Sequence, residues 1–308
     1  MTKLRALVVG LGVQGRKRRA FAGADYVASV DPVAADADYR ALDSVPLGAY
    51  DAALLCVPDD EKPALMRHLL GHGKHVLVEK PLMTPRDEEL REIEALAHKT
   101  GAVCYTAYNH RFEPHYVRMR DLIVSGELGR IYSCRMFYGN GTARLVRDSA
   151  WRDQGAGVLF DLGSHLLDTC RFWFGEIDDG FAPLAVNSFE NRAPDHVVVA
   201  SERGSPRIEL EMTLLMWRNH FTCDILAERG SAHIESLCKW GPASFVHRRR
   251  VLPSGRPPEE RVTLIEDDPT WALEYAHFQR LCEERAPADL GNDLWLQRTL
   301  RRLAGAVP

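Results

Sequence analysis

The stretch Leu4-Arg-Ala-Leu-Val-Val9, followed directly by Gly10-Leu-Gly-Val-Gln-Gly15, is the strongest indication of how the first part of this 308-residue chain folds. A short apolar run of that length is typical of a buried strand, and residues 14–22 are expected to form a helix. In a turn from strand to helix, the first glycine permits the bend, the second lets a pyrophosphate approach the backbone, and the third lets helix and strand pack closely. Amides at the start of the helix would then hold the phosphates. The stretch therefore predicts a dinucleotide-binding loop.

A carboxylate follows this loop at a suitable distance. A second strand, expected at residues 26–30, ends at Asp31, close to the spacing of roughly 20 residues after Gly12 at which an acid binds the adenosine ribose. Because a carboxylate accepts from ribose hydroxyls and repels a 2′-phosphate, Asp31 predicts NAD rather than NADP. Arg40 and the basic residues 16–19 lie near enough in sequence to bear on that choice. The alternative is a chance glycine pattern, with Asp31-Pro32 as a plain turn.

Composition narrows the class of protein. With 45% hydrophobic and 27% charged residues, the chain resembles an ordinary globular protein of about two domains. A formal net charge of -4 predicts no nucleic-acid partner, and the lack of any run of roughly 18 apolar residues predicts no membrane partner. The seven cysteines form no Cys-x-x-Cys pair and the twelve histidines show no metal-ligand spacing. We therefore expect reduced thiols, no metal and a cytoplasmic protein.

Strand and helix patterns alternate through the first third of the chain. Strands are expected at residues 50–57, 75–78 and 103–107, with helices at residues 62–71 and 86–99 between them. Such alternation implies parallel strands joined by helical crossovers. We therefore expect residues 1–116 to form an α/β NAD-binding Rossmann domain with a parallel, doubly wound sheet.

The pattern changes after a helix expected at residues 114–126. Ile208, Leu210, Met212 and Leu214 alternate with polar residues, the period-two pattern of a half-buried antiparallel sheet. Residues 117–308 should therefore form an α+β domain for substrate binding and oligomerisation, with a large, open, mainly antiparallel sheet. A sheet face left uncovered by helices would favour a homodimer or homotetramer through sheet stacking. Further strands are expected at residues 131–138, 197–202 and 220–227, and helices at residues 158–174, 270–284 and 293–304.

Two polar segments are candidates for chemistry. Glu79-Lys80-Pro81 follows the fourth expected strand, and doubly wound sheets bind ligands at the carboxyl ends of strands. Pro81 restricts the backbone of Lys80 and so directs its side chain. Asp161 and His165 are four residues apart at the start of a helix and share one face of it. Three other readings stay open: Lys80 as a surface lysine, Asp161 as a helix cap and His165 as a core histidine.

Together these motifs resemble the glucose-fructose oxidoreductase, inositol dehydrogenase and MocA-like family. Glu-Lys-Pro with Asp-x-Gly-x-His downstream is a specific combination. One departure is Val57-Pro58-Asp59 with Lys62, where many relatives carry Thr-Pro-Asn with a histidine three residues on. The resemblance covers residues 6–175 and is carried by Gly10 to Gly15, Asp31, Cys56-Val-Pro58, Val78-Glu-Lys-Pro81, Tyr108-Asn-His-Arg-Phe112 with Pro114, and Gly157-Val-Leu-Phe-Asp-Leu-Gly-Ser-His165-Leu-Leu-Asp168.

The resemblance implies a catalytic set and a cofactor site. His165 would take a proton from a substrate hydroxyl while a hydride leaves the same carbon for nicotinamide. Lys80 would stabilise the developing oxyanion, and Asp161 would orient the substrate or the histidine. Arg111, Trp151 and Arg152 would reach the substrate. The implied cofactor-binding residues are Gly10, Gly12, Val13, Gln14, Gly15, Asp31, Cys56, Val57, Pro58, Glu79, Lys80 and Asn109.

The leading hypothesis is an NAD-dependent oxidoreductase that acts on a secondary alcohol of a sugar, cyclitol or sugar nucleotide, with Lys80 and His165 as acid and base machinery. Two alternatives stay open. A non-catalytic dinucleotide-binding regulator would need the glycine loop and Asp31 but would have no use for Lys80 and His165 together. The other alternative is an enzyme that retains NAD as a prosthetic group and catalyses elimination or glycosidic cleavage without net oxidation.

Overall fold

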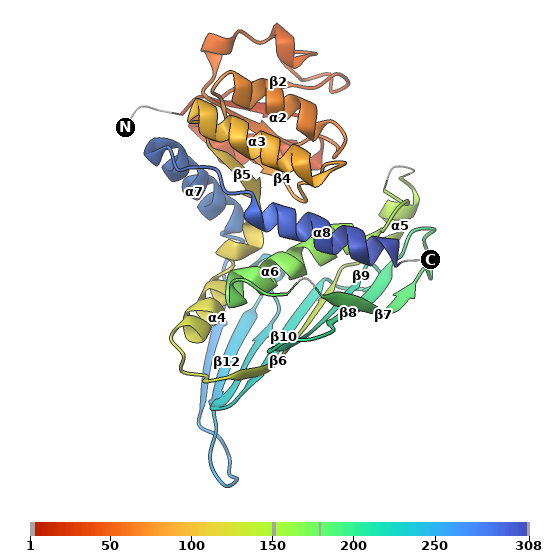
Figure 1. Cartoon of the computed structure of the whole chain (residues 1–308), viewed down its shortest axis with the longest axis vertical. Helices are drawn as coiled ribbons and strands as arrows, with labels where there is room; N and C mark the ends of the chain where they lie inside the picture. The colour runs from red at the N-terminus through yellow and green to blue at the C-terminus, as the bar shows by residue number, and fades with distance from the viewer. Residues whose placement is uncertain (1–3, 150–151, 179, 307–308) are drawn as a thin grey trace. The chain divides into compact units, whose positions relative to one another are not determined.

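The computed structural model describes residues 4–149, 152–178 and 180–306. The chain forms two compact units, and each combines two separate segments of the sequence (Figure 1). The first unit consists of Met1–Asn109 and Trp271–Gln297, and the second of His110–Thr270 and Arg298–Pro308. The domain boundary expected between residues 116 and 117 stays a prediction, because compact units do not by themselves establish where independently folding domains end.

The first unit is built on a five-stranded, wholly parallel sheet with the order β2-β1-β3-β4-β5. This arrangement confirms the predicted parallel, doubly wound sheet. Its strands are β1 (Ala6–Val9), β2 (Tyr26–Val30), β3 (Ala52–Leu55), β4 (His75–Glu79) and β5 (Cys104–Ala107). Its helices are α1 (Val13–Ala22), α2 (Lys62–Gly71), α3 (Asp87–Thr100), α7 (Thr270–Glu284) and the first part of α8 (Gly291–Gly305), with short 3-10 turns η1 (Gly23–Asp25), η2 (Leu42–Ser44), η3 (Leu47–Ala49) and the start of η4 (Asn109–Phe112).

Both faces of this sheet are covered by helices, which explains why its strands read as continuous apolar runs. Alternate residues of β1 point to opposite faces. Leu7 and Val9 join the apolar cluster formed with α2 and α3, whereas Ala6 and Val8 join the cluster formed with α1 and α7. The carboxyl ends of β1, β3 and β4 therefore share one edge of a rigid sheet, where the glycine loop, Cys56 and Lys80 follow.

A buried arginine ties α1 to α7 within this unit. Arg18 Nε lies 2.7 Å from Glu79 Oε1, and its Nη1 lies 2.6 Å from Glu274 Oε2. The same guanidinium lies over the ring of Trp271, 4.4 Å from its centroid. Burial raises the pKa of Glu274 to about 7, although Arg18 opposes the shift. Arg18 thus fixes α1 against the end of β4. Although Arg18 belongs to the basic residues 16–19, its side chain is buried.

The second unit is built on an eight-stranded sheet with the order β13-β12-β11-β10-β6-β9-β8-β7. Neighbouring strands are antiparallel except β6 and β9, which are parallel, so the predicted large, mainly antiparallel sheet is confirmed. No helix within the described residues is long and apolar enough to cross a membrane. The strands are β6 (Ile131–Gly139), β7 (Phe181–Asn187), β8 (His196–Ser201), β9 (Arg207–Thr213), β10 (His220–Ala227), β11 (Gly230–Glu235), β12 (Ala243–Arg249) and β13 (Glu259–Leu264). The helices are α4 (Pro114–Val124), α5 (Ala143–Arg147), the π-helical η5 (Leu159–Gly163), α6 (Ser164–Phe174), the 3-10 turn η6 (Cys238–Trp240) and the last part of α8.

One face of this sheet packs under α4 and α6 (Figure 1). The two helices are joined by a hydrogen bond from Trp173 Nε1 to Tyr116 O of 3.0 Å. The alternation predicted in β9 is confirmed, because Ile208, Leu210 and Met212 are at most 2% exposed. This face forms the core of the second unit and holds α6 in place.

The opposite face of the sheet is partly exposed and mixed in character. Arg135 of β6 and Glu209 of β9 form an ion pair of 3.0 Å across neighbouring strands. Leu226 of β10 is 54% exposed. The homodimer or homotetramer expected through this face stays a prediction.

The helix predicted at residues 158–174 is not regular throughout. The sequence predicts one α-helix, but Leu159–Gly163 form a π-helix before α6 continues from Ser164. A Cβ on Gly163 would lie 2.8 Å from Met212 Sδ, so this turn packs directly on β9. The spacing of apolar residues does not distinguish this π turn from a regular α-helical turn, because the two differ by only one residue in a single turn. Such π turns are frequent at functional sites, and this one contains Asp161.

Candidate cofactor and active site

The glycine loop between β1 and α1 has the geometry that a dinucleotide needs. Gly10 has φ +89°, and a Cβ there would lie 2.4 Å from Cys56 O. A Cβ on Gly15 would lie 1.8 Å from Gly10 O, so helix and strand meet at van der Waals contact. Around Gly12, in contrast, no heavy atom lies within 4 Å of the position that a Cβ would take. The bend at Gly10 and the close packing at Gly15 agree with the roles that the sequence predicts, and the approach of a pyrophosphate to Gly12 stays a prediction.

The start of α1 is open to an anion. Gly12 is its N-cap, no side chain caps the helix, and the first turn contains no acidic residue. Val13 and Gln14 are exposed beside it. Uncapped amides at a helix start bind phosphate groups, so the loop fits the pyrophosphate of a dinucleotide.

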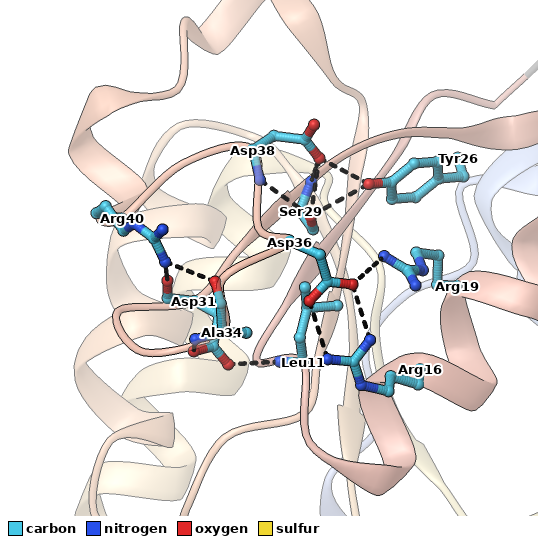
Figure 2. Close-up of polar contacts among 10 residues, drawn as sticks. All are labelled: Leu11, Arg16, Arg19, Tyr26, Ser29, Asp31, Ala34, Asp36, Asp38 and Arg40. Carbon is cyan, nitrogen blue, oxygen red and sulfur yellow. Dashed lines mark hydrogen bonds and ion pairs between the residues drawn. The ribbon is translucent and has the colours of Figure 1, made fainter.

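Asp31 connects the end of β2 to the glycine loop (Figure 2). Its Oδ2 accepts from Leu11 N at 2.7 Å, and its Oδ1 accepts from Val33 N at 2.8 Å and Ala34 N at 2.7 Å. Burial alone would raise the pKa of Asp31, but the three amide hydrogen bonds outweigh it and hold the pKa below its usual value. A carboxylate can accept about four hydrogen bonds, so the charged side chain retains capacity for a ribose hydroxyl.

Two arginines of the basic run, Arg16 and Arg19, pair with Asp36, whereas Arg40 contacts the backbone around Asp31 (Figure 2). Both terminal nitrogens of Arg16 donate to Asp36, at 2.8 and 2.9 Å, and Arg19 donates to the same carboxylate at 3.2 Å. Arg40 donates to the backbone oxygens of Ala34 at 2.5 Å and Asp31 at 3.4 Å, and its charge helps to lower the pKa of the Asp31 carboxyl. The carboxylate of Asp31 directly contacts the glycine loop, through its hydrogen bond with Leu11 N.

Lys80 follows β4 in a turn whose backbone is fixed by a second lysine. Lys62 Nζ donates to Glu79 O at 2.6 Å and to Pro81 O at 2.9 Å. It also pairs with Asp59 at 2.6 Å and is only 1% exposed. Lys62 belongs to the segment in which the sequence analysis expected a departure from the family pattern, and it holds the carbonyl groups on both sides of Lys80. The sequence identified the departure but not this role.

The remaining predicted cofactor residues of the first unit lie at the same edge of the sheet. Glu79 pairs with Arg18, and desolvation raises the pKa of the Cys56 thiol, which therefore stays neutral. Val57 is half-buried and Pro58 is exposed. Asn109 is buried at the start of η4. Their contacts with a cofactor stay predictions.

Asp161 and His165 lie on the π turn and the first turn of α6 in the second unit. Asp161 Oδ2 lies 3.8 Å from Arg152, so the structure brings these two predicted residues together. The His165 ring is buried and stacks on His110, with 4.0 Å between centroids and 17° between planes. Lys80 belongs to the first unit, and its joint action with these residues stays a prediction.

Arg111 and Trp151 are the other two residues that the resemblance predicts to contact the substrate. Arg111 donates to both oxygens of Asp168, at 2.9 and 2.5 Å, and this bidentate pair holds the guanidinium in one orientation. Trp151 lies outside the described residues. The roles of Arg111, Trp151 and Arg152 toward a substrate stay predictions.

Sequence analysis assigned no role to two residues near His165: His110, which stacks on it, and Lys239, which contacts His110. His110 is part of the quoted Tyr108 to Phe112 motif, but no role was predicted for it. Lys239 Nζ lies 3.1 Å from His110 Nε2 and 3.3 Å from Tyr138 OH. No local motif marks Lys239, because it joins this group only through the pairing of β10, β11 and β12. The second unit thus contributes a histidine pair and an ammonium group to one cluster.

Two domain families match the chain. Residues 4–108 match the family described as "Oxidoreductase family, NAD-binding Rossmann fold". Residues 116–233 match the family described as "GFO/IDH/MocA C-terminal domain". Together these matches cover most of the first segment of each unit and end at residue 233.

Curated relatives include the uncharacterized oxidoreductase YdgJ of Escherichia coli (strain K12), 33% identical over 128 residues, which are 41% of this chain and 36% of YdgJ. The inositol 2-dehydrogenase of Rhizobium meliloti (strain 1021) is 27% identical over 158 residues, which are 49% of this chain and 47% of that enzyme. The matched stretches thus span less than half the length of either relative.

Among solved structures, a levoglucosan dehydrogenase in complex with NADH superposes with a TM-score of 0.83 and 17% identity. The superposition covers 98% of this chain and 96% of that one. At this identity the likeness shows the fold. Taken with the matches of both domain families, it means that the chain belongs to the Gfo/Idh/MocA oxidoreductase family, with an NAD-binding Rossmann fold in its first unit.

Proposed function

We propose that this protein is an NAD-dependent oxidoreductase that transfers a hydride between nicotinamide and a secondary alcohol of a sugar, cyclitol or sugar nucleotide. The observation that carries the proposal lies within the first unit. The open glycine loop with Asp31 and the rigid turn with Lys80 follow strands of one parallel sheet and share its carboxyl edge. A protein that only bound a dinucleotide would not need Lys80 in a turn whose carbonyl groups on both sides are fixed by hydrogen bonds.

The chain's residues divide into cofactor and substrate roles. The amides of the glycine loop would hold the pyrophosphate and Asp31 the ribose. NAD, when bound, supplies an acceptor for the hydride that leaves the substrate carbon. His165 takes the proton from the reacting hydroxyl, and the Lys80 ammonium stabilises the negative charge that develops on its oxygen. Asp161, paired with Arg152, orients the substrate.

The names of relatives support the substrate class. One relative is an inositol 2-dehydrogenase, and a protein of the same fold is a levoglucosan dehydrogenase. Both names indicate polyhydroxylated rings. We extend this class, a ring with several secondary alcohols, to the present chain.

Asp31 should decide between the two nicotinamide cofactors. We expect Asp31→Asn to lower the ratio of the dissociation constants for NADP and NAD at least ~10-fold, because it removes the charge that repels a 2′-phosphate. Calorimetry with both cofactors measures this ratio. Asp43→Asn, a change at an exposed carboxylate, is the matched control. An unchanged ratio in Asp31→Asn would refute the assignment of Asp31 as the residue that selects NAD.

The function itself is tested by NADH formation. The purified protein is incubated with NAD and a panel of sugars, cyclitols and sugar nucleotides, beside Lys80→Met and the exposed control Lys99→Met. We expect oxidation of at least one compound, a loss of ~10²-fold or more in Lys80→Met, and normal rates in Lys99→Met. Silence across the panel with NAD binding intact would favour a regulator. Substrate consumption without net NADH would favour the retained-NAD enzyme.

A further inference from the structure

The turn that carries Lys239 is held in an unusual backbone conformation. It joins β11 to β12 and contains η6. Ser236, just before it, has φ +68°, a left-handed conformation that costs energy for a residue other than glycine. Such strained positions are concentrated at functional sites. Gly241, just after the turn, has φ +111°.

The same turn is anchored to the helical side of the unit. Cys238 N donates to Glu113 Oε1 at 3.0 Å, and Glu113 is only 1% exposed. His115 Nε2 lies 3.1 Å from Ala243 O at the start of β12. Both ends of the turn are therefore fixed against the segment that precedes and begins α4. This arrangement gives the side chain of Lys239 a defined direction.

Lys239 points toward the histidine pair. Its Nζ donates to His110 Nε2 at 3.1 Å and to Tyr138 OH at 3.3 Å, and it lies 4.6 Å from the ring centroid of Trp240. Because an ammonium group can only donate, Nε2 of His110 is the acceptor. The ring of the same His110 stacks on the ring of His165. Lys239 is therefore one residue removed from the proposed base.

The two arginines near the histidine pair have carboxylate partners, whereas Lys239 has none close by among the described residues. Arg111 pairs with Asp168, and Arg152 lies 3.8 Å from Asp161. Among the residues that the structure describes, no carboxylate oxygen lies within 4.0 Å of Lys239 Nζ. Burial lowers the pKa of Lys239 to about 8, and Asp268, Glu113 and Asp161 oppose this shift only in part. The second unit thus holds a half-buried ammonium group without a close counterion.

We propose that Lys239 binds a carboxylate of the substrate, which makes an acidic sugar the substrate class of this protein. The inference rests on the proposed function and narrows it. An ammonium group has three N–H donors, and the contacts with His110 and Tyr138 occupy two of them. A carboxylate would accept from the third and supply the missing charge, whereas a neutral hydroxyl would leave the ammonium uncompensated. A lysine can also bind phosphate as a point charge, so the experiment below includes a phosphorylated sugar as the outcome that contradicts a carboxylate.

The test compares matched substrates in the full-length protein. Methyl glycosides, the corresponding methyl uronides and the corresponding hexose 6-phosphates are supplied in the gluco, galacto and manno configurations. Values of kcat/KM with NAD are measured for the wild type, Lys239→Met, Lys239→Arg and the control Lys99→Met. The readout is the ratio of uronide to glycoside, which a uniform loss of activity does not change. Thermal melting establishes that each variant is folded.

We expect the wild type and Lys99→Met to prefer a uronide to its glycoside at least ~10-fold, a difference of about 1.4 kcal/mol. Lys239→Met should bring this ratio close to one through a higher KM for the uronide, and Lys239→Arg should restore part of it. An equal ratio in wild type and Lys239→Met would overturn the proposal. So would a preference for the 6-phosphate that depends on Lys239, because the bound anion would then be a phosphate.

Calorimetry separates this inference from the proposed function. Methyl uronides are titrated into the wild type and Lys239→Met, each saturated with NADH so that no alcohol can be oxidised. Binding to the wild type that Lys239→Met weakens ~10-fold or more supports the carboxylate site even if no compound is turned over. Oxidation of neutral glycosides without uronide binding would leave the proposed function standing and remove the inference.

Discussion

Replacing His165 with glutamine is expected to lower kcat by ~10²–10⁴-fold, the usual contribution of a general base. Glutamine keeps a polar group of similar size but cannot take up the proton of the reacting hydroxyl. NAD should still bind, because the glycine loop and Asp31 belong to the first unit. Steady-state kinetics on the best substrate of the panel, with calorimetry for NAD, measures both effects.

A histidine elsewhere in the second unit gives the matched control. His220 lies on β10, beside Phe137 rather than beside His110. His220→Gln should keep kcat within a small factor of the wild type. If His165→Gln kept more than about a tenth of the wild-type kcat, the base would have to be another residue, and the buried position of His165 would reflect only packing.

Gly15→Ala is expected to destabilise the first unit by about 3 kcal/mol and to abolish NAD binding. Its Cβ would lie 1.8 Å from Gly10 O, a backbone atom that cannot rotate away. The helix start would have to separate from β1, which would disrupt the phosphate-binding amides. Chemical denaturation measures the free energy of unfolding, and calorimetry measures the affinity for NAD.

Gly12→Ala separates binding from stability in the same loop. A Cβ there meets no heavy atom within 4 Å, and the residue has φ −66°, which alanine adopts without strain. The free energy of unfolding should change by no more than about 0.5 kcal/mol, whereas the new methyl group occupies the space expected for the pyrophosphate and should weaken NAD binding. Equal losses of stability in both variants would contradict this division of roles.

The local features of the first unit follow from short stretches of sequence. Gly10, Gly12 and Gly15 can be assigned separate roles because each role depends on backbone sterics within a few residues. Asp31 is found by its spacing, since one helix and one strand separate it from the loop. The alternation in β9 reveals its buried face for the same reason: neighbouring side chains of a strand point in opposite directions.

Other features required the tertiary structure. The contact of Lys62 with the carbonyl groups of Glu79 and Pro81 depends on how α2 packs beside β4. Helix α7 packs on the first sheet although its residues lie far along the chain. The apolar pattern of α7 predicts a helix with a buried face but does not indicate which of the two sheets it covers.

The family, the two sheet types, the dinucleotide loop and the candidate residues Lys80, Asp161 and His165 could be predicted from the sequence alone, because these features depend on local backbone constraints and on compact motifs. The stacking of His110 on His165 and the contact of Lys239 with His110, with no carboxylate close to Lys239 in the described part of the chain, emerge from the tertiary structure alone. Contacts between residues so far apart in sequence arise from strand order and helix packing, and these are set by burial across the whole unit rather than by any short pattern.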